Sequence, residues 1–147
     1  GFLPDDLIPP LSAMMRKSTM SGNASALNRA MMAAASGKHA EALGMLDEML
    51  AGMQQTAHER DLIADELDLR ARAAKVKANV LEEMGRPHQA CQFYEFSAMD
   101  AHRIVQMAPA SVELTDYFPT LRYLHHQLAS HYVFQAHDFD RAIVHYE

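Results

Sequence analysis

The sequence predicts an all-α fold built from antiparallel helical hairpins. Good helix formers (Ala, Leu, Met, Glu and Gln) dominate the composition, and the chain has no Trp and few β-branched runs. A unit of helix, glycine turn and second helix spans residues 71–103, and similar units occur at 25–50 and 121–147. A single domain of 147 residues is long enough for these units to bury a shared core.

The unit at 71–103 has the clearest pattern. Gly85 is suited to end its first helix, because a residue without Cβ adopts the left-handed conformation at no steric cost. Pro87 is suited to the first turn of the next helix, where an N–H would have no partner. Small residues on both helices predict a close antiparallel approach, with one bulky residue from each helix filling the remaining space. The small residues are Ala74, Ala78, Ala90 and Ser97, and the bulky ones are Leu81 and Tyr94.

The other two units repeat this arrangement. In the first, small residues precede Gly37 and a mixed apolar stripe follows it; in the third, Ala136-His137 replaces the turn glycine. The residues that form this pattern are Ala30, Ala33, Ala42, Leu46 and Met49 in the first unit. In the third unit they are Leu128, Ala129, Tyr132, Phe139, Ala142 and Tyr146.

The repeated unit resembles the tetratricopeptide repeat (TPR) family, most closely at GKHAEAL, GRPHQACQFYE and HDFDRAIVHYE. The resemblance covers about residues 25–147. It implies a right-handed superhelix, an α-solenoid of about three hairpins, whose concave groove binds a peptide or helix of a partner protein. The turn glycines lie 85 − 37 = 48 residues apart, whereas a TPR repeats every ~34, so these repeats are long and atypical. An ordinary helical bundle is the alternative.

The chain divides into an N-terminal extension or cap at 1–20 and a TPR-like domain at 21–147. Three prolines argue against a regular helix before residue 10, and Ser21 and Asn23 suggest a linker with helix caps at 18–24. The first two helices of the domain are expected at about 24–36 and 39–55. The last helix is still amphipathic at Glu147, which predicts that the array is truncated at its C-terminus and can self-associate through uncapped ends.

A long helix is expected at about 57–84, apolar on two faces and polar on the third. Two apolar faces suit the interior of a stacked array, because such a helix contacts neighbours on both sides. The residues of the polar face follow one another at intervals of three or four. They are Asp61, Asp65, Asp68, Arg72, Lys75, Asn79 and Glu82.

Two residues of this polar face match a binding motif of the family. Lys75 and Asn79, four residues apart, resemble the TPR carboxylate clamp, which grips the C-terminal carboxylate of a partner peptide by charge-assisted hydrogen bonds. The nearest counterpart of the asparagine from the next repeat is Gln127. The predicted partner-binding residues are therefore Arg72, Lys75, Asn79 and Gln127. The alternative is an ordinary helix surface, on which Asp68 and Glu82 neutralise Arg72 and Lys75.

Composition narrows the function further. A net charge of −6 argues against nucleic acid binding, and no apolar run approaches the ~18 residues of a membrane span. The single Cys91 is expected to be a reduced core thiol of an intracellular, cytoplasmic protein. Eight of the eleven methionines fall at or before Met53 and form either core or an adaptable binding surface.

No catalytic motif is visible, and the histidines lack the spacing of a metal site, so neither an enzyme nor a cofactor is expected. The most plausible function is a scaffold or adaptor that binds another protein. The alternative is a helical regulatory or sensor domain of a larger protein that binds a small ligand or peptide. The two are distinguished by the site, since a sensor needs a mostly apolar pocket and a scaffold an open polar channel.

Overall fold

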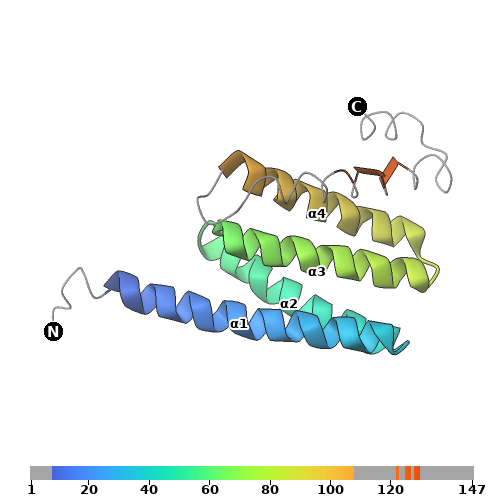
Figure 1. Cartoon of the computed structure of the whole chain (residues 1–147), viewed down its shortest axis with the longest axis horizontal. Coiled ribbons are helices and arrows are strands. Elements are labelled where there is room, and N and C mark those ends of the chain that lie inside the picture. Colours follow the sequence, from blue (N-terminus) through green and yellow to red (C-terminus); the bar gives the residue numbers. More distant parts are fainter. Residues whose placement is uncertain (1–7, 108–121, 123–124, 127, 130–147) are drawn as a thin grey trace.

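The computed structural model describes residues 8–107 and, beyond them, residues 122, 125, 126, 128 and 129. Residues 8–107 form four helices, α1 (Ile8–Ala35), α2 (His39–Glu59), α3 (Ala64–Glu83) and α4 (Pro87–Met107). The helices pair as two antiparallel hairpins, α1 with α2 and α3 with α4 (Figure 1). The described part of the chain contains no strand, which confirms the all-α class.

Helix α3 is the central element of the described fold. It packs against each of the other three helices and most extensively against α4, and Figure 1 shows it between α4 and the α1–α2 pair. The sequence prediction that this helix is apolar on two faces is confirmed. The buried residues of the first face are Leu67, Ala71, Ala74, Ala78 and Leu81, and those of the second are Leu69, Ala73 and Val80.

Both hairpins turn at the predicted glycines. Gly37 and Gly85 have φ of 79° and 75°, the left-handed region that is costly for any residue with a Cβ. Each turn also forms two hydrogen bonds that satisfy the last carbonyls of the preceding helix. At the second turn, the N–H of Arg86 donates to the carbonyl of Leu81 at 2.8 Å, and the N–H of Gly85 to that of Glu82 at 2.9 Å. The first turn has the same pair of bonds, from Lys38 and Gly37.

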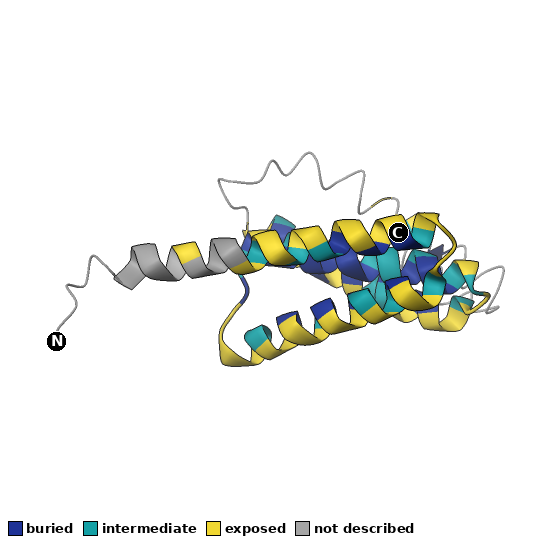
Figure 2. Cartoon of the chain, turned by 90° about the horizontal axis from the view of Figure 1, so that it is seen from below, coloured by how far each residue is buried: buried dark blue, intermediate teal, exposed yellow. Residues whose placement is uncertain are grey.

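The core consists of alanine-lined seams filled by a few larger side chains, as the sequence predicts. Figure 2 shows the buried residues lying between the helices and the exposed ones outside. Ala30, Ala42, Ala78 and Ala90 are fully buried. One cluster joins the first hairpin to α3, and it contains Leu27, Ala30, Leu46, Met49, Met53, Leu69 and Ala73. Another joins α3 to α4 and includes Ala78, Leu81, Ala90, Cys91, Tyr94, Ala98, Leu128 and Ala129.

Helix α1 differs from its prediction. It runs without a break from Ile8 to Ala35, so the linker expected at 18–24 is wrong. Pro9 and Pro10 lie in its first turn, where their missing N–H groups would have no helical partner. Ser and Asn are tolerated inside a helix as well as at its ends, so the residues interpreted as caps do not interrupt it. The boundary predicted between 1–20 and 21–147 falls within this helix.

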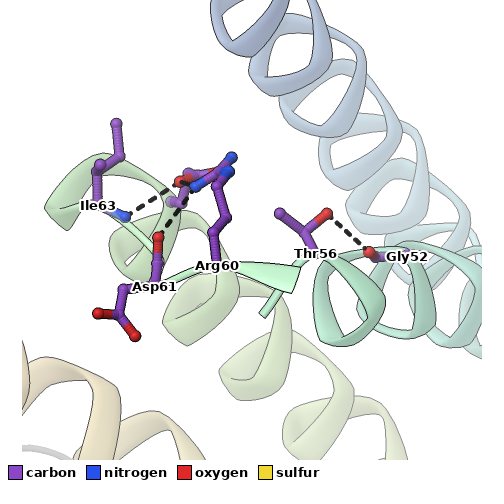
Figure 3. Close-up of polar contacts among 6 residues, drawn as sticks. Gly52, Thr56, Arg60, Asp61 and Ile63 are labelled. Carbon is purple, nitrogen blue, oxygen red and sulfur yellow. Dashed lines mark hydrogen bonds and ion pairs between the residues drawn. The ribbon is translucent and has the colours of Figure 1, made fainter. Parts of the chain in front are cut away.

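The connection between α2 and α3 also lies elsewhere than predicted. α2 continues to Glu59, residues 60–63 form the link, and α3 begins at Ala64, so the single helix expected at 57–84 is shorter. The carboxylate of Glu66 fixes this link. It accepts hydrogen bonds from the backbone N–H of Ile63 at 3.1 Å and from both terminal nitrogens of Arg60 at 2.7 Å. Figure 3 shows these bonds together with the one that Thr56 donates to the Gly52 carbonyl at the end of α2.

The third predicted unit lies largely outside the described residues. Two of its named residues, Leu128 and Ala129, are fully buried against Ala78 and Tyr94 of the second hairpin. None of the helices within the described part of the chain combines the length and the apolarity required to cross a membrane.

Candidate functional site

The predicted partner-binding residues that the structure describes lie together on α3. Arg72 is exposed, and its Nε is 3.2 Å from a carboxylate oxygen of Asp68 one turn earlier. This is the helix-surface ion pair that the sequence offers as the alternative to a clamp. Such exposed pairs stabilise a helix by only about 0.3–0.5 kcal/mol, so a partner's carboxylate can replace Asp68 at small cost.

Lys75 and Asn79 are half-buried and lie one turn apart. The Oδ1 of Asn79 accepts a hydrogen bond from the hydroxyl of Tyr94 on α4. With Oδ1 turned toward Tyr94, the NH₂ of Asn79 is the group that can reach a carboxylate. Burial raises the pKa of the neighbouring Glu82, and a hydrogen bond with Tyr94 lowers it in part. Gln127, the fourth predicted residue, lies outside the described residues.

A second candidate site lies between the C-terminal half of α2, the 60–63 link, α3 and the end of α4. A pocket of about 580 Å³ opens there. This volume falls within the range of about 300–1,000 Å³ that is usual for small-molecule sites. We call it the link pocket, and its walls are Gln54, Ala57, Asp61, Leu62, Leu67, Arg70, Phe96, Arg103, Gln106 and Met107.

Arg70 contributes to one wall of the link pocket and belongs to a buried ion pair. The guanidinium of Arg70 donates from Nε and Nη2 to the two carboxylate oxygens of Asp100, at 2.7 and 2.8 Å. The side chains are only 7% and 1% exposed, so the charges are almost completely removed from water. The guanidinium also lies 5.4 Å from the centre of the Phe96 ring, a cation–π distance. Arg70 is therefore held rigidly between its carboxylate and the aromatic ring.

Sequence reasoning missed this pair, although two signals point to it. Both residues occupy apolar stripes: Arg70 lies three residues after Leu67, and Asp100 three after Ser97. Both also lie the same distance from the turn glycine, since 85 − 70 = 15 and 100 − 85 = 15. Residues equidistant from the turn of an antiparallel hairpin face each other, so opposite charges at these positions predict a pair across the seam.

The 60–63 link that forms another wall is held in place by electrostatics. The hydrogen bond and charge of Glu66 raise the pKa of Arg60 above its ordinary value, against a smaller lowering by burial. The pair is bidentate, and Glu66 is almost fully buried. The link therefore presents Asp61 and Leu62 to the pocket from a rigid backbone.

A third feature joins α4 to the segment after it. The Nε2 atoms of His102 and His125 are 2.9 Å apart, with their ring centres 5.2 Å apart. Within the residues that the structure describes, His, Cys, Asp and Glu form no group of three or more that could hold a metal ion.

The fold is all-α, and its described part consists of two packed antiparallel helical hairpins. It carries a polar row on α3, formed by Arg72, Lys75 and Asn79, and a separate pocket with mixed walls. In comparisons with protein-family models, with curated proteins and with solved structures, nothing matches this chain.

Proposed function

We propose that this chain is a protein-interaction module, a TPR-like scaffold or adaptor that holds a peptide or helix of a partner protein against α1 and α3. The observation that carries the proposal is the position of α3. It packs against α1, the corresponding helix of the preceding hairpin, as well as against α2 and α4. Two first helices side by side are what a groove of the TPR kind requires.

The chemistry of the polar row on α3 supports this proposal. Arg72, Lys75 and Asn79 stand outside the hydrophobic clusters of the core, on successive turns of one helix. Two cations and an amide in a row favour a ligand with a carboxylate, such as a peptide C-terminus or an acidic side chain. Gln127 is the proposed contribution from the following unit.

The exposed methionines of α1 give a second line of support. Met31 and Met32 are 48% and 70% exposed, whereas Met49 and Met53 of α2 are buried. The methionine-rich half therefore contributes core residues from α2 and leaves Met31 and Met32 of α1 exposed for the proposed binding surface. Flexible, polarizable side chains on a surface adapt to apolar groups of different shapes, which suits a partner helix or peptide with an apolar face.

Affinity capture with the 147-residue chain tests the proposal. We expect the double substitution Lys75→Glu and Asn79→Ala to lose at least tenfold of the wild-type yield of specifically bound partner. A matched variant, Lys38→Glu with Gln92→Ala, likewise reverses one lysine charge and removes one side-chain amide, at exposed positions away from the row, and is expected to retain the partner. If the row variant captures the same proteins in the same amounts as wild type, the groove proposal is wrong.

The second candidate function is the small-ligand sensor, and the volume of the link pocket is the observation that favours it. The walls of the pocket are mixed, whereas the sensor expected from the sequence has a mostly apolar pocket. The pocket is formed by other residues than the polar row, so the two candidates are tested by different substitutions.

A further inference from the structure

We infer that the link pocket is a binding site for a small carboxylate with an apolar body, a ligand of the size of an arylalkanoic acid or an apolar amino acid. This inference does not rest on the proposed partner-binding groove. It follows from three properties of the pocket walls: an apolar floor, an arginine that forms no ion pair with any residue the structure describes, and a second arginine already fixed in orientation.

The apolar part of the site combines buried and exposed groups. Leu62 and Leu67 are buried at 9% and 4% exposure, whereas Phe96 and Met107 are 42% and 50% exposed. Large apolar side chains left exposed around a concave site are a usual sign of a ligand surface. A ring or short alkyl chain placed there would cover Phe96 and Met107 and rest on the two leucines.

The cationic part of the site is Arg103. Its side chain is exposed, and among the residues described it forms no ion pair or hydrogen bond. It lies seven residues after Phe96 and four before Met107, so all three share one face of α4. A ligand whose apolar body covers Phe96 and Met107 therefore places its polar end beside a guanidinium, whose fork geometry matches a carboxylate.

Arg70 is the second arginine in the lining of the pocket. Its Nε and Nη2 are used by Asp100, which leaves Nη1 outside that pair. The charge of Arg70 is balanced by Asp100, which leaves one cation, Arg103, and one anion, Asp61, among the described residues of the lining. A ligand with a single carboxylate is therefore a better match than a doubly charged phosphate ester, which Asp61 would repel more strongly.

Asp61 determines which carboxylates bind best. Only its backbone carbonyl has a partner, the Nη1 of Arg60, and its carboxylate forms no ion pair within the described part of the chain. Figure 3 shows this carboxylate turned away from Arg60. A ligand that carries an ammonium group as well as a carboxylate offers a partner to Asp61 as well as to Arg103, and free amino acids with apolar side chains meet this requirement.

Titrations followed by amide NMR spectra of the 147-residue chain test the inference. The probes are 3-phenylpropanoate, its neutral amide 3-phenylpropanamide, and phenylalanine. We expect both carboxylates to give saturable shifts at the link-pocket residues, and the amide to bind at least tenfold more weakly. Tighter binding of phenylalanine than of 3-phenylpropanoate would assign the ligand as an amino acid, and the reverse order as a simple acid. The inference would be overturned if neither carboxylate, at about 5 mM, shifted the amide resonances of these residues.

Variants connect any binding to the named residues. Arg103→Gln is expected to weaken the binding of both carboxylates at least tenfold and to leave the weak binding of the amide unchanged. Arg86→Gln, which changes an exposed arginine at the turn, should alter neither affinity. Phe96→Ala should weaken the binding of all three probes. Met99→Ala, which changes another exposed apolar residue of α4 outside the pocket, should not. Equal affinity of the Arg103→Gln and wild-type proteins for 3-phenylpropanoate would show that the pocket does not select a carboxylate.

Discussion

Arg70 and Asp100 place two full charges inside a seam that otherwise consists mostly of alanine. Removing two such charges from water costs several kcal/mol each, and only their bidentate contact makes the arrangement tolerable. Loss of one partner leaves the other charged and buried, which is far more costly than loss of an exposed pair. The loss of stability caused by substituting one member of an ion pair therefore depends more on how deeply the pair is buried than on the number of hydrogen bonds lost.

We expect Asp100→Ala to lower the free energy of unfolding by about 3–5 kcal/mol, because it leaves the guanidinium of Arg70 unpaired. Asp47→Ala is the matched control. It breaks the ion pair with Lys77, in which Asp47 is 56% exposed, and should cost less than about 1 kcal/mol. Urea denaturation of both variants at pH 7 measures the difference. Similar losses in the two variants would contradict the role given to burial.

The residues that could be predicted from sequence are those whose role is local. Gly37 and Gly85 follow from backbone conformation, and the buried alanines from the period of a helix, so both were predictable. The Arg70–Asp100 pair depends on how two helices are aligned, which no single helix specifies and which only the equal distance of the two residues from Gly85 indicates. The polar row was predicted as a set of residues, but the bond from Tyr94 to Asn79 crosses between helices and was not.

At the scale of the helix, the ends that were predicted well are those marked by glycine and proline. α4 begins at Pro87, as the proline predicts, and the inward residues Ala90, Tyr94 and Ser97 are buried. The α2–α3 link was missed because its determinants are Arg60 and Glu66, which are six residues apart and typical of any helix surface. The residue before α3 is Ile63, which is not one of the usual capping types.

Two glycine substitutions should change the free energy of unfolding in opposite directions. Gly85→Ala forces a side chain into the left-handed region, at φ of 75°, and should cost about 1–2 kcal/mol. Gly44→Ala lies inside α2, where the added methyl meets no atom within 4 Å, and should stabilise by about 0.5–1 kcal/mol. Thermal or urea unfolding of the two variants decides this. A loss of stability in Gly44→Ala would show that α2 is not a regular helix at that point.

At the scale of the whole molecule, composition and helical period were enough to predict the all-α class and the two described hairpins. The superhelical arrangement of about three hairpins remains a proposal, since it depends on how successive hairpins rotate relative to one another. The described residues closest to this question are Leu128 and Ala129, which bury themselves completely against α3 and α4. They show that the chain after α4 returns to the core of the second hairpin.

We expect Leu128→Ala to lower the free energy of unfolding by about 2–5 kcal/mol, the usual range for a fully buried leucine. The exposed Arg122 is the control, and Arg122→Ala should change stability by no more than about 0.5 kcal/mol. Far-ultraviolet circular dichroism during urea unfolding measures both. Equal stability of the two variants would mean that this contact adds nothing to the folded molecule.

The bidentate pair of Arg70 and Asp100 has a consequence for the alignment of neighbouring helices. Seams lined by alanine are shallow, so two such helices can slide along each other with few steric clashes. A slip by one helical turn would move Asp100 by about 5.4 Å and separate it from Arg70, leaving both ions dehydrated and alone. The buried charges therefore raise the free energy of a misaligned α3–α4 hairpin. The shape of the alanine-lined seam alone would distinguish only weakly between the correct and the shifted alignment.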